Sequence, residues 1–577
     1  MKIEIIRHSI SHLLAAAVQE LFPKAKFAIG PVIENGFYYD FDLPVRLTPE
    51  DLSRLEKKMR ELMKKNLIFD KREFSKTEAK KIFKDQPYKL ELIEGLKEKK
   101  ATIYQSGRFT DLCRGPHVRS VKEIKPDAFK LTKIAGAYWK GDEKNKMLQR
   151  IYGVAFKTKK ELDRYLAKQA EAEKSDHRQL NQTLNLYLIS DEIGPGLIML
   201  KPKGAIIREE IEKFWKEVHR QRGYEYVSTP HIGKLDLWKK SGHWQFYREN
   251  LFSPIKIEET EYLLKPMNCP FHVQIYQSEI RSYRDLPIRY CELGTVYRYE
   301  KAGVLHGLMR VRGFTQDDAH IFCRPDQLAE EVVGVLDLAV FMLKAFGFKE
   351  YQFELALRDP KAKKKKYLGS DQVWQQAEKA LVYALNKKKL KYQRAEGEAV
   401  FYGPKIDIKL IDSLGRGWQG PTIQVDFNFP QKFNLSYIDN EGKKQTPIMV
   451  HRTVLGATDT RFLGNLIEHY GGAFPTWLAP VQIWLIPVGS RHKKYAQQVA
   501  KQFQEAGLRF ELKDDNETVS KKIRDGEIQK IPYLLVVGDK EEKSDSVSVR
   551  NREKGDLGPM KNKKFVGQIK EEIEKKK

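Results

Sequence analysis

Four side chains suited to metal binding or acid–base chemistry form two pairs in the amino-terminal part of the chain. His8 and His12 are separated by three residues, and so are Cys113 and His117. On a helix this spacing places both members of a pair on one face. If the pairs met, they could form a tetrahedral zinc site, or a metal-free hydrolytic cleft in which imidazoles position a water. Two unrelated helices with buried histidines are the third interpretation.

A second group of candidate ligands lies further along the chain. Cys269 is followed three residues later by His272, while His320 and His451 stand apart. The Cys-x-x-His spacing is compatible with a metal site, although a lone pair of this kind is more often incidental. Spacing alone does not decide which three or four of these side chains meet.

Arginines inside strand-like segments suggest an anion site. Arg298 lies in the strand-like run before Glu300, and Arg310 and Arg312 follow. A nucleoside triphosphate needs cations that bind two oxygens at once, and the planar guanidinium does this. A salt bridge between Arg298 and Glu300 is the alternative. The glycine-rich fingerprints of P-loop and dinucleotide-binding sites are missing from the sequence, so a nucleotide would be held differently.

Hydrophobic periodicity predicts the elements that would position these residues. Residues 7–22 carry an apolar stripe typical of a helix, and this helix would present His8 and His12. The turn-rich segment 27–42 indicates a hairpin. A polar stretch without Gly or Pro, 159–182, is typical of an exposed linker helix between domains.

Two further regions follow the linker. From residue 186 to about 475, long strand patterns alternate with loops and helices, which predicts an α+β domain with an antiparallel sheet. The last region alternates strand, helix, strand and strand at 481–488, 493–506, 508–512 and 532–537. This order predicts a separate, mainly parallel α/β module.

Size and charge set broader limits. A chain of 577 residues exceeds a single core, so roughly three or four domains are expected. The 104 Lys and Arg residues against 78 Asp and Glu give a formal charge of +26. Such an excess predicts attraction to a polyanion, or simply a lysine-rich surface, and charge alone favours neither.

The sequence gives no sign of a membrane or secretory protein. No run of about eighteen apolar residues occurs, so no membrane partner is expected. The first residues have too short an apolar stretch for a signal peptide. The spacing of the four cysteines does not suggest a disulfide framework, and a cytoplasmic location is expected.

Long strings spread over nearly the whole chain carry a family resemblance. They occupy residues 111–117, 265–270, 305–320, 399–407, 418–419, 424–426, 450–452 and 474–480. In this order they resemble threonyl-tRNA synthetases, a family of class II aminoacyl-tRNA synthetases. Strings of this length are far more specific than a short motif.

The resemblance implies a multidomain α+β fold. Its parts would be an α+β editing domain, a linker helix, a class II catalytic domain with an antiparallel sheet, and an α/β anticodon-binding domain, at 1–158, 159–184, 185–478 and 479–577. It implies a ligase that activates threonine with ATP and Mg²⁺ to threonyl-adenylate and transfers it to threonine tRNA. Hydrolysis of mischarged seryl-tRNA, a homodimer and one Zn²⁺ per chain are implied as well.

The resemblance assigns roles in the catalytic domain residue by residue. Residues at the reacting groups would be Arg298, Arg461 and His243, the last near the terminal adenosine of the tRNA. The ATP-binding set would be Arg298, Glu300, Arg310, Gln419 and Arg461. Threonine would be surrounded by Met267, Gln316, Asp318, Tyr402 and Gln424. Zinc would be bound by Cys269, His320 and His451. His272 is predicted not to be a ligand.

It also assigns roles in the outer domains. The editing cleft would contain His8, His12, Lys89, Asp111, Cys113 and His117. We predict that this cleft is metal-free, because four protein ligands would close a catalytic zinc site. The anticodon-facing positions would be Asn516, Arg524, Glu541 and Arg550.

One motif departs from the family pattern. Residues 456–461 read Gly-Ala-Thr-Asp-Thr-Arg, whereas the family usually has Gly-Ser-x-Glu-Arg, one residue shorter. This departure is the only feature that favours an alternative function, that of a catalytically silent, RNA-binding relative. A stand-alone editing hydrolase is a second alternative, which the arginines near Arg298 and the zinc candidates disfavour. Threonine-dependent exchange of pyrophosphate into ATP distinguishes all three.

Overall fold

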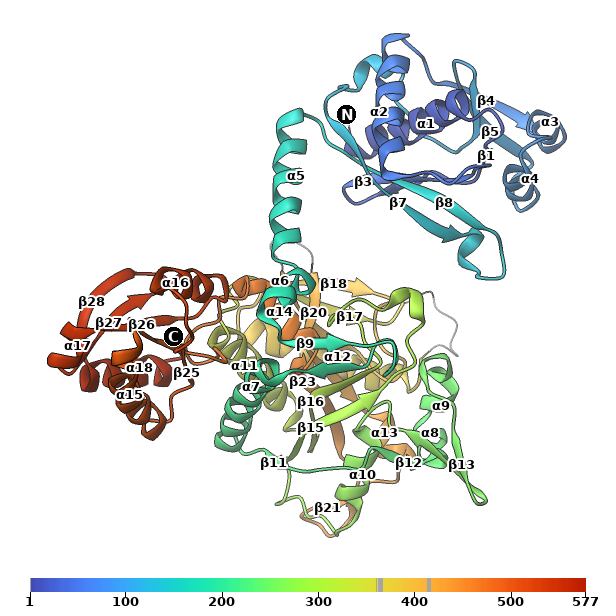
Figure 1. Cartoon of the computed structure of the whole chain (residues 1–577). Helices are drawn as coiled ribbons and strands as arrows, with labels where there is room; N and C mark the ends of the chain where they lie inside the picture. Colours follow the sequence, from blue (N-terminus) through green and yellow to red (C-terminus); the bar gives the residue numbers. More distant parts are fainter. Residues whose placement is uncertain (1, 360, 362–366, 412–416, 577) are drawn as a thin grey trace. The chain divides into compact units, whose positions relative to one another are not determined.

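The described part of the chain covers residues 2–359, 361, 367–411 and 417–576 of a computed structural model. Its internal contacts separate two units, Met1–Ala170 and Glu171–Lys577, which are drawn in one colour gradient in Figure 1. The first and last residues of the predicted domains, 1 and 577, lie outside the described residues.

The amino-terminal unit is built around helix α1 (Ile3–Leu21), which begins four residues before the predicted helix. α1 packs on α2 (Pro49–Lys64) and on an antiparallel five-stranded sheet. The sheet strands are β1 (Lys26–Phe27), β2 (Val32–Ile33), β3 (Gly36–Asp42), β7 (Phe129–Tyr138) and β8 (Met147–Ala155). β2 and β3 form the predicted hairpin. The β3–β8 pairing requires Gly36, because a Cβ there would lie 1.9 Å from the Gly153 carbonyl oxygen.

A smaller sheet completes this unit. Its strands β4 (Asp70–Ser75), β5 (Lys100–Ser106) and β6 (Phe109–Leu112) are antiparallel. Helices α3 (Lys76–Ile82) and α4 (Pro87–Glu94) connect β4 to β5. Their apolar residues form a core of their own around Phe83 and Ile93.

The predicted single linker helix at 159–184 is wrong, because two helices occupy it. α5 (Lys159–Lys174) ends before Asp176, whose side chain accepts the backbone N–H of Arg178 and so caps α6 (His177–Leu184). An Asp side chain in a non-helical backbone conformation is a strong helix start. Only α5 is largely exposed, since His177 and Leu184 of α6 are buried.

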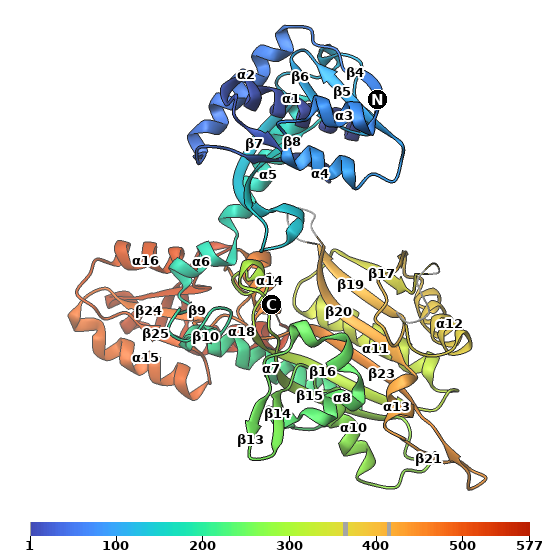
Figure 2. The same ribbon diagram turned by 90° about the vertical axis from the view of Figure 1, so that its right-hand side faces the viewer.

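An antiparallel sheet dominates the second unit, as expected. Its order is β11-β15-β16-β23-β20-β19-β17-β18, and only the edge pairs β11–β15 and β17–β18 are parallel. Figure 2 shows these strands. They are β11 (Glu225–Tyr226), β15 (Ile288–Tyr297), β16 (Gly313–Cys323), β17 (Tyr351–Leu357), β18 (Tyr392–Glu396), β19 (Lys405–Ile411), β20 (Gly417–Asp426) and β23 (Ile448–Ala457).

Helices cover one face of this sheet and leave the other for a site. α7 (Pro202–Gln221), α11 (Leu328–Ala345) and α12 (Asp371–Lys387) share one apolar core with the sheet. Along β16 successive side chains alternate between faces, so Ala319 and Ile321 enter this core. Asp318 and His320 consequently point the other way, where they line a cavity.

Shorter elements complete the catalytic part of the second unit. The helices are α8 (Leu235–Ser241), α9 (His243–Phe246), α10 (Cys269–Gln277), α13 (Asn428–Lys432) and α14 (Arg461–Tyr470). The strands are β9 (Tyr187–Ile189), β10 (Ile198–Leu200), β12 (Ile232–Lys234), β13 (Ile255–Ile257), β14 (Thr260–Leu264), β21 (Tyr437–Ile438) and β22 (Lys444–Gln445).

The carboxy-terminal module has a mixed sheet, so the prediction of a mainly parallel one needs correction. The strand order is β25-β24-β26-β27-β28. The pairs β25–β24 and β24–β26 are parallel, and the pairs β26–β27 and β27–β28 are antiparallel. The strands are β24 (Ile483–Pro487), β25 (Phe510–Leu512), β26 (Tyr533–Val537), β27 (Ser546–Asn551) and β28 (Gly555–Lys561). The helices are α15 (Lys493–Glu505), α16 (Val519–Ile528), α17 (Asp539–Lys543) and α18 (Asn562–Glu574). Among the described residues, no helix combines the length and apolarity that crossing a membrane requires.

Candidate functional site

A cavity of about 570 Å³ opens on the uncovered face of the large sheet. Of the residues predicted for this domain, it is lined by Met267, Cys269, Arg298, Glu300, Arg310, Gln316, Asp318, His320, Tyr402, Gln419, Gln424, His451 and Arg461. Residues from β16, β20 and β23 form its floor, while α10 and the start of α14 contribute from outside the sheet. Segments separated by almost two hundred residues therefore meet in one hollow.

Three of these residues form a compact cluster of metal-ligand atoms. Within it, the ligand atoms of Cys269, His320 and His451 all lie within 4.8 Å of one another. Strand pairing sets the two histidines opposite each other on β16 and β23, while Cys269 is the first residue of α10. All three are buried. Burial raises the pKa of the Cys269 thiol well above its usual range.

Neighbouring polar groups orient the cluster and the floor beside it. His451 Nε2 lies 3.1 Å from Asp426 Oδ2. Asn268 Nδ2 donates to Asp318 Oδ2 at 3.1 Å. The hydroxyl of Tyr402 donates to Gln424 Oε1. Asp426 and Asn268 were not predicted, although both lie within or beside the strings that carry the family resemblance.

Three arginines converge on the other end of the cavity. Arg298 donates through Nε to the Pro266 carbonyl at 3.3 Å, and Arg310 pairs with Glu300 at 3.0 Å. Burial, followed by the charges of Arg298 and Arg310, lowers the pKa of Arg461. Three cations this close repel one another unless an anion lies between them. The arrangement is therefore suited to a polyphosphate.

The altered motif at 456–461 keeps Arg461 in the cavity. Asp459 accepts the backbone N–H of Thr315 at 2.8 Å and its hydroxyl at 2.7 Å. Thr458 also bonds to Thr315 through the backbone. These contacts fasten the longer segment to β16, so that Arg461 begins α14 at the cavity wall.

His243 differs from the other predicted residues. It is 1% exposed, and it is not one of the described residues that line the cavity. Its Nδ1 lies 2.7 Å from the Ser241 hydroxyl, and burial lowers its pKa to about 3. In this conformation the ring is closed off from a substrate, although Phe401 beside it lines the cavity.

In the amino-terminal unit, the two predicted pairs do meet. Ligand atoms of His8, His12, Cys113 and His117 lie within 4.8 Å of one another. The Cys113 sulfur is 3.2 Å from His8 Nε2 and 3.3 Å from His117 Nε2. Burial raises the pKa of Cys113 to about 12 and lowers the pKa of all three histidines. Without an added charge, the cluster is neutral near pH 7.

An ionic group lies against this cluster. Lys89 and Asp111 form a buried ion pair, and His12 Nε2 is 3.5 Å from Asp111 Oδ2. Tyr39, which the sequence did not suggest, donates its hydroxyl proton to Asp111 at 2.7 Å and accepts from Lys89 at 3.2 Å. The residues predicted for this cleft thus lie together in space, and Tyr39 lies among them.

The positions predicted to face the anticodon are spread over the carboxy-terminal module. Asn516 and Arg524 are exposed, the latter on α16. Arg550 on β27 is also exposed and pairs with Glu527 at 3.1 Å. Glu541 has a local task, because its carboxylate accepts the Gly538 N–H and caps α17.

A further group of potential ligands, Asp176, His177 and Glu468, is explained without a metal. His177 Nδ1 lies 2.8 Å from Glu468, and its Nε2 accepts the Leu308 N–H at 3.0 Å. Both ring nitrogens are therefore engaged. The contacts join α6 to α14 and to the loop that carries Arg310.

Three family models match the chain. The model described as "tRNA synthetase class II core domain (G, H, P, S and T)" matches residues 252–470. The "Anticodon binding domain" matches 482–572. The "Threonyl and Alanyl tRNA synthetase second additional domain" matches 101–152. These matches follow the chain in the order of the modules described above.

Individual proteins are similar over almost the full length. A threonine–tRNA ligase of Dehalococcoides mccartyi is 55% identical, with 95% of this chain and 93% of that protein covered. One from Nitrosococcus oceani is 52% identical, with 97% and 86% covered. The solved RNA-binding domain of threonyl-tRNA synthetase from Cryptosporidium parvum superimposes with a TM-score of 0.65 at 36% identity. It covers 69% of this chain and 98% of its own.

Proposed function

Because this chain belongs to the threonine–tRNA ligase family, we propose that its large cavity binds ATP, threonine and a zinc ion through the residues described above. The chain is an aminoacyl-tRNA synthetase with a class II core and an editing domain, and its partners are threonine, ATP and tRNA. The observation that supports the site assignment is the meeting of three arginines and a Cys–His–His cluster in one cavity.

At the arginine end, the triphosphate of ATP would be neutralised with Mg²⁺. Arg298 would contact the α-phosphate, with Arg310 and Arg461 on the remaining phosphates. The threonine carboxylate then attacks the α-phosphorus and pyrophosphate leaves. Positioning and charge neutralisation provide most of the catalysis in such a transfer. Glu300, which pairs with Arg310 at 3.0 Å, would turn to the adenine amino group.

At the other end, Cys269, His320 and His451 fit a zinc ion. They are preferred ligands, and three of them leave positions open for the amino group and hydroxyl of threonine. A buried acceptor such as Asp318 would lose its partner if valine bound, which lacks the hydroxyl. An apolar pocket alone discriminates against an isostere only about a hundredfold. Met267, Gln316, Tyr402 and Gln424 would enclose the amino acid.

Serine keeps the hydroxyl and lacks one methyl group, a difference worth only about 1–3 kcal/mol in a pocket. A second site is therefore needed, and the cleft around His8 and His12 supplies it. We propose that the imidazoles hold a water that attacks the seryl ester. Lys89 would then lie near the developing negative charge. We further propose that this cleft acts without a metal.

Oligomeric state and location are part of the same proposal. Apolar side chains near the start of the catalytic domain are exposed, with Tyr226 51% and Leu188 44% accessible. A second copy of the chain would cover them in a homodimer. A cytoplasmic location agrees with tRNA as substrate and with four free cysteines.

Replacement of Arg298 by alanine tests the synthetic site. Arg298→Ala should abolish threonine-dependent exchange of pyrophosphate into ATP, because the α-phosphate loses its bidentate partner. Hydrolysis of pre-made seryl-tRNA should continue at the wild-type rate, which serves as the internal control. Exchange at a near-normal rate would contradict the assignment. Wild-type protein without any exchange would instead favour a silent RNA-binding relative.

A further inference from the structure

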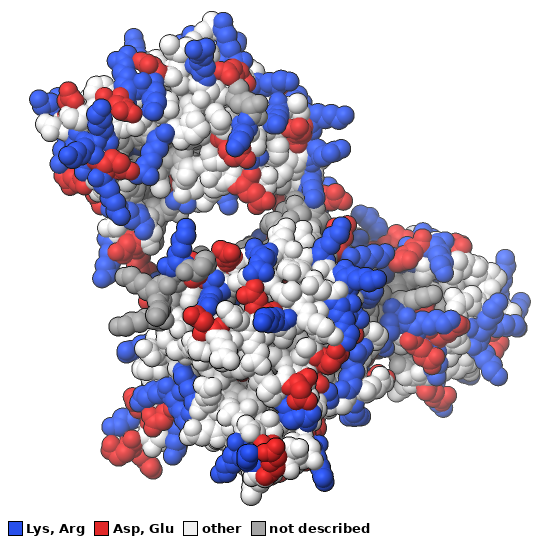
Figure 3. All heavy atoms as spheres, turned by 180° about the vertical axis from the view of Figure 1, so that it is seen from behind, with Lys and Arg blue, Asp and Glu red and all other residues white. Residues whose placement is uncertain are grey.

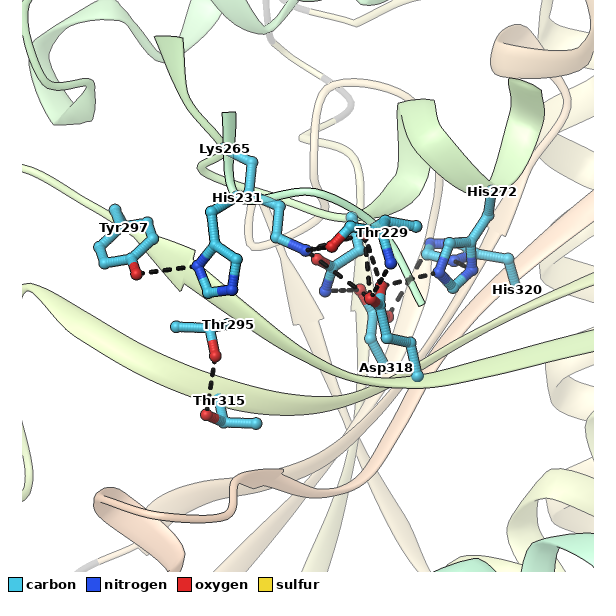
Figure 4. Close-up of polar contacts among 11 residues, drawn as sticks. Thr229, His231, Lys265, His272, Thr295, Tyr297, Thr315, Asp318 and His320 are labelled. Carbon is cyan, nitrogen blue, oxygen red and sulfur yellow. Dashed lines mark hydrogen bonds and ion pairs between the residues drawn. The ribbon is translucent and has the colours of Figure 1, made fainter. Parts of the chain in front are cut away.

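Three buried side chains form a series of hydrogen bonds that ends at the proposed zinc site. Glu292 Oε2 lies 3.2 Å from His272 Nε2, and His272 Nδ1 lies 2.8 Å from His320 Nδ1. Figure 4 shows the imidazoles of His272 and His320 close to Asp318. From this geometry we infer that His272 is a positioning residue, which fixes the tautomer of His320 and thereby prepares Nε2 of His320 to bind the metal. The inference rests on the proposed zinc site.

The direction of each proton donation follows from Glu292, the acceptor at the far end of this series of hydrogen bonds. Glu292 receives the Thr229 N–H at 2.7 Å and the Thr229 hydroxyl at 2.9–3.0 Å. Lys265 Nζ lies 3.8 Å from the same carboxylate. A carboxylate so surrounded by donors acts only as an acceptor. His272 must therefore donate from Nε2.

A neutral His272 that donates from Nε2 can only accept at Nδ1. His320 must then carry its own proton on Nδ1. Its Nε2 is left with a lone pair, and within the described residues this buried atom has no hydrogen-bond partner. The nearest carboxylate oxygen, on Asp318, is 3.8 Å away. A metal ion would satisfy this lone pair.

The opposite arrangement is disfavoured. If His272 carried both protons, His320 would accept at Nδ1 and present an N–H from Nε2 toward the cluster. That would leave a buried donor without an acceptor, which costs free energy and blocks coordination. His272 itself cannot replace a ligand, because both of its ring nitrogens are already occupied.

Glu292→Gln tests the tautomer with almost no change of shape. The Thr229 N–H and Lys265 Nζ lie at Oε1, while the Thr229 hydroxyl lies 3.0 Å from Oε1 and 2.9 Å from Oε2, so the amide oxygen should take the Oε1 position. The amide NH₂ would then face His272 and force it to accept at Nε2 and donate at Nδ1. His320 would in turn hold its proton on Nε2.

The measurement is competition for zinc between the full-length protein and a chromophoric chelator. Glu292→Gln should weaken zinc binding about ten- to hundredfold, as expected when a partner of a ligating histidine is lost. The absorption spectrum of the Co²⁺-substituted protein should change as well. His272→Asn is the matched variant, because its amide oxygen can still accept from His320 Nδ1. It should bind zinc within a few-fold of wild type, whereas His272→Phe should not.

Zinc affinity that is unchanged in both Glu292→Gln and His272→Phe would overturn the inference. So would equal losses in His272→Asn and His272→Phe, which would mean that the ring only fills space. If His272→Phe does not fold, the comparison of Glu292→Gln with His272→Asn decides. Cys269→Ala separates this question from the zinc assignment. Full zinc content in that variant would show that the site itself is misassigned.

Discussion

At the scale of single residues, the amino-terminal cluster consists of groups whose pKa values burial shifts toward the neutral form. In the amino-terminal cleft the thiol of Cys113 stays protonated, because burial holds its pKa at about 12. The same burial lowers the pKa of His12 and His117. Neutral imidazoles can accept a proton from water, which hydrolysis requires. Four side chains whose ligand atoms lie within 4.8 Å of one another nevertheless make this cleft the place where the metal-free proposal is tested most directly.

We predict the outcome for the paired variant His8→Ala/His12→Ala. Seryl-tRNA should accumulate, because the imidazoles that position the water are gone, while charging with threonine should continue. Aminoacylation with serine and with threonine, followed by hydrolysis assays, measures both. Metal analysis of the wild-type protein should find one zinc per chain. Two zincs would contradict the metal-free cleft, and unchanged seryl-tRNA hydrolysis would remove the editing assignment.

At the scale of elements, helix α6 is joined to the loop that lines the arginine end of the cavity. His177 is fully buried and joins Glu468 of α14 to the backbone of Leu308. The next residue of that loop, Met309, accepts a hydrogen bond from Arg461 at 3.1 Å. Arg461 and the segment that carries Arg310, which we propose to bind ATP, are thus held by one local network.

His177→Leu should loosen this network. The variant leaves a buried N–H and a carboxylate without their partner, at a cost of about 1–3 kcal/mol. We expect a lower Tm of the second unit and a higher KM for ATP in pyrophosphate exchange, with the KM for threonine little changed. Arg178→Ala is the control on the same helix, because the Arg178 side chain, which pairs with Asp176, is 51% exposed and pairs at the surface contribute little. Equal effects of both variants would refute the role of His177.

At the scale of the whole molecule, positive charge is distributed rather than confined to one stripe. On the face shown in Figure 3, Lys and Arg side chains occur over both units, with acidic residues among them. The formal charge of +26 suits a long RNA partner that touches several modules. Specificity must then come from individual side chains that reach unstacked bases.

Arg550→Ala should weaken charging of threonine tRNA by raising its KM several-fold, because an exposed guanidinium facing base edges is lost. Threonine activation, measured without tRNA, should be unaffected. Glu527→Ala is a useful companion, since it frees Arg550 from its ion pair without removing the guanidinium. If Arg550→Ala lost activation and charging to the same extent, the carboxy-terminal module would not act on tRNA separately from threonine activation, and the proposed separation of roles would be wrong.

Much of this protein was determined by its sequence. Long strings such as residues 305–320 identify the family, and local periodicity predicts α1, the β2–β3 hairpin and the strand–helix order of the last module. These features depend on residues close together in the chain, where backbone preference and side-chain alternation act directly. The ligand types could therefore be named from the sequence, and the resemblance selected His320 and His451 from a larger set.

The tertiary structure decided what depends on distant contacts. Strand pairing brought His320 opposite His451, and burial beside Glu292 gave His272 a role that spacing could not suggest. The linker became two helices because α6 buries His177 against α14. The antiparallel strands β27 and β28 likewise could not be predicted from the local sequence pattern. Hydrogen-bond direction, pKa and strand partner are set by neighbours brought together only when the chain folds.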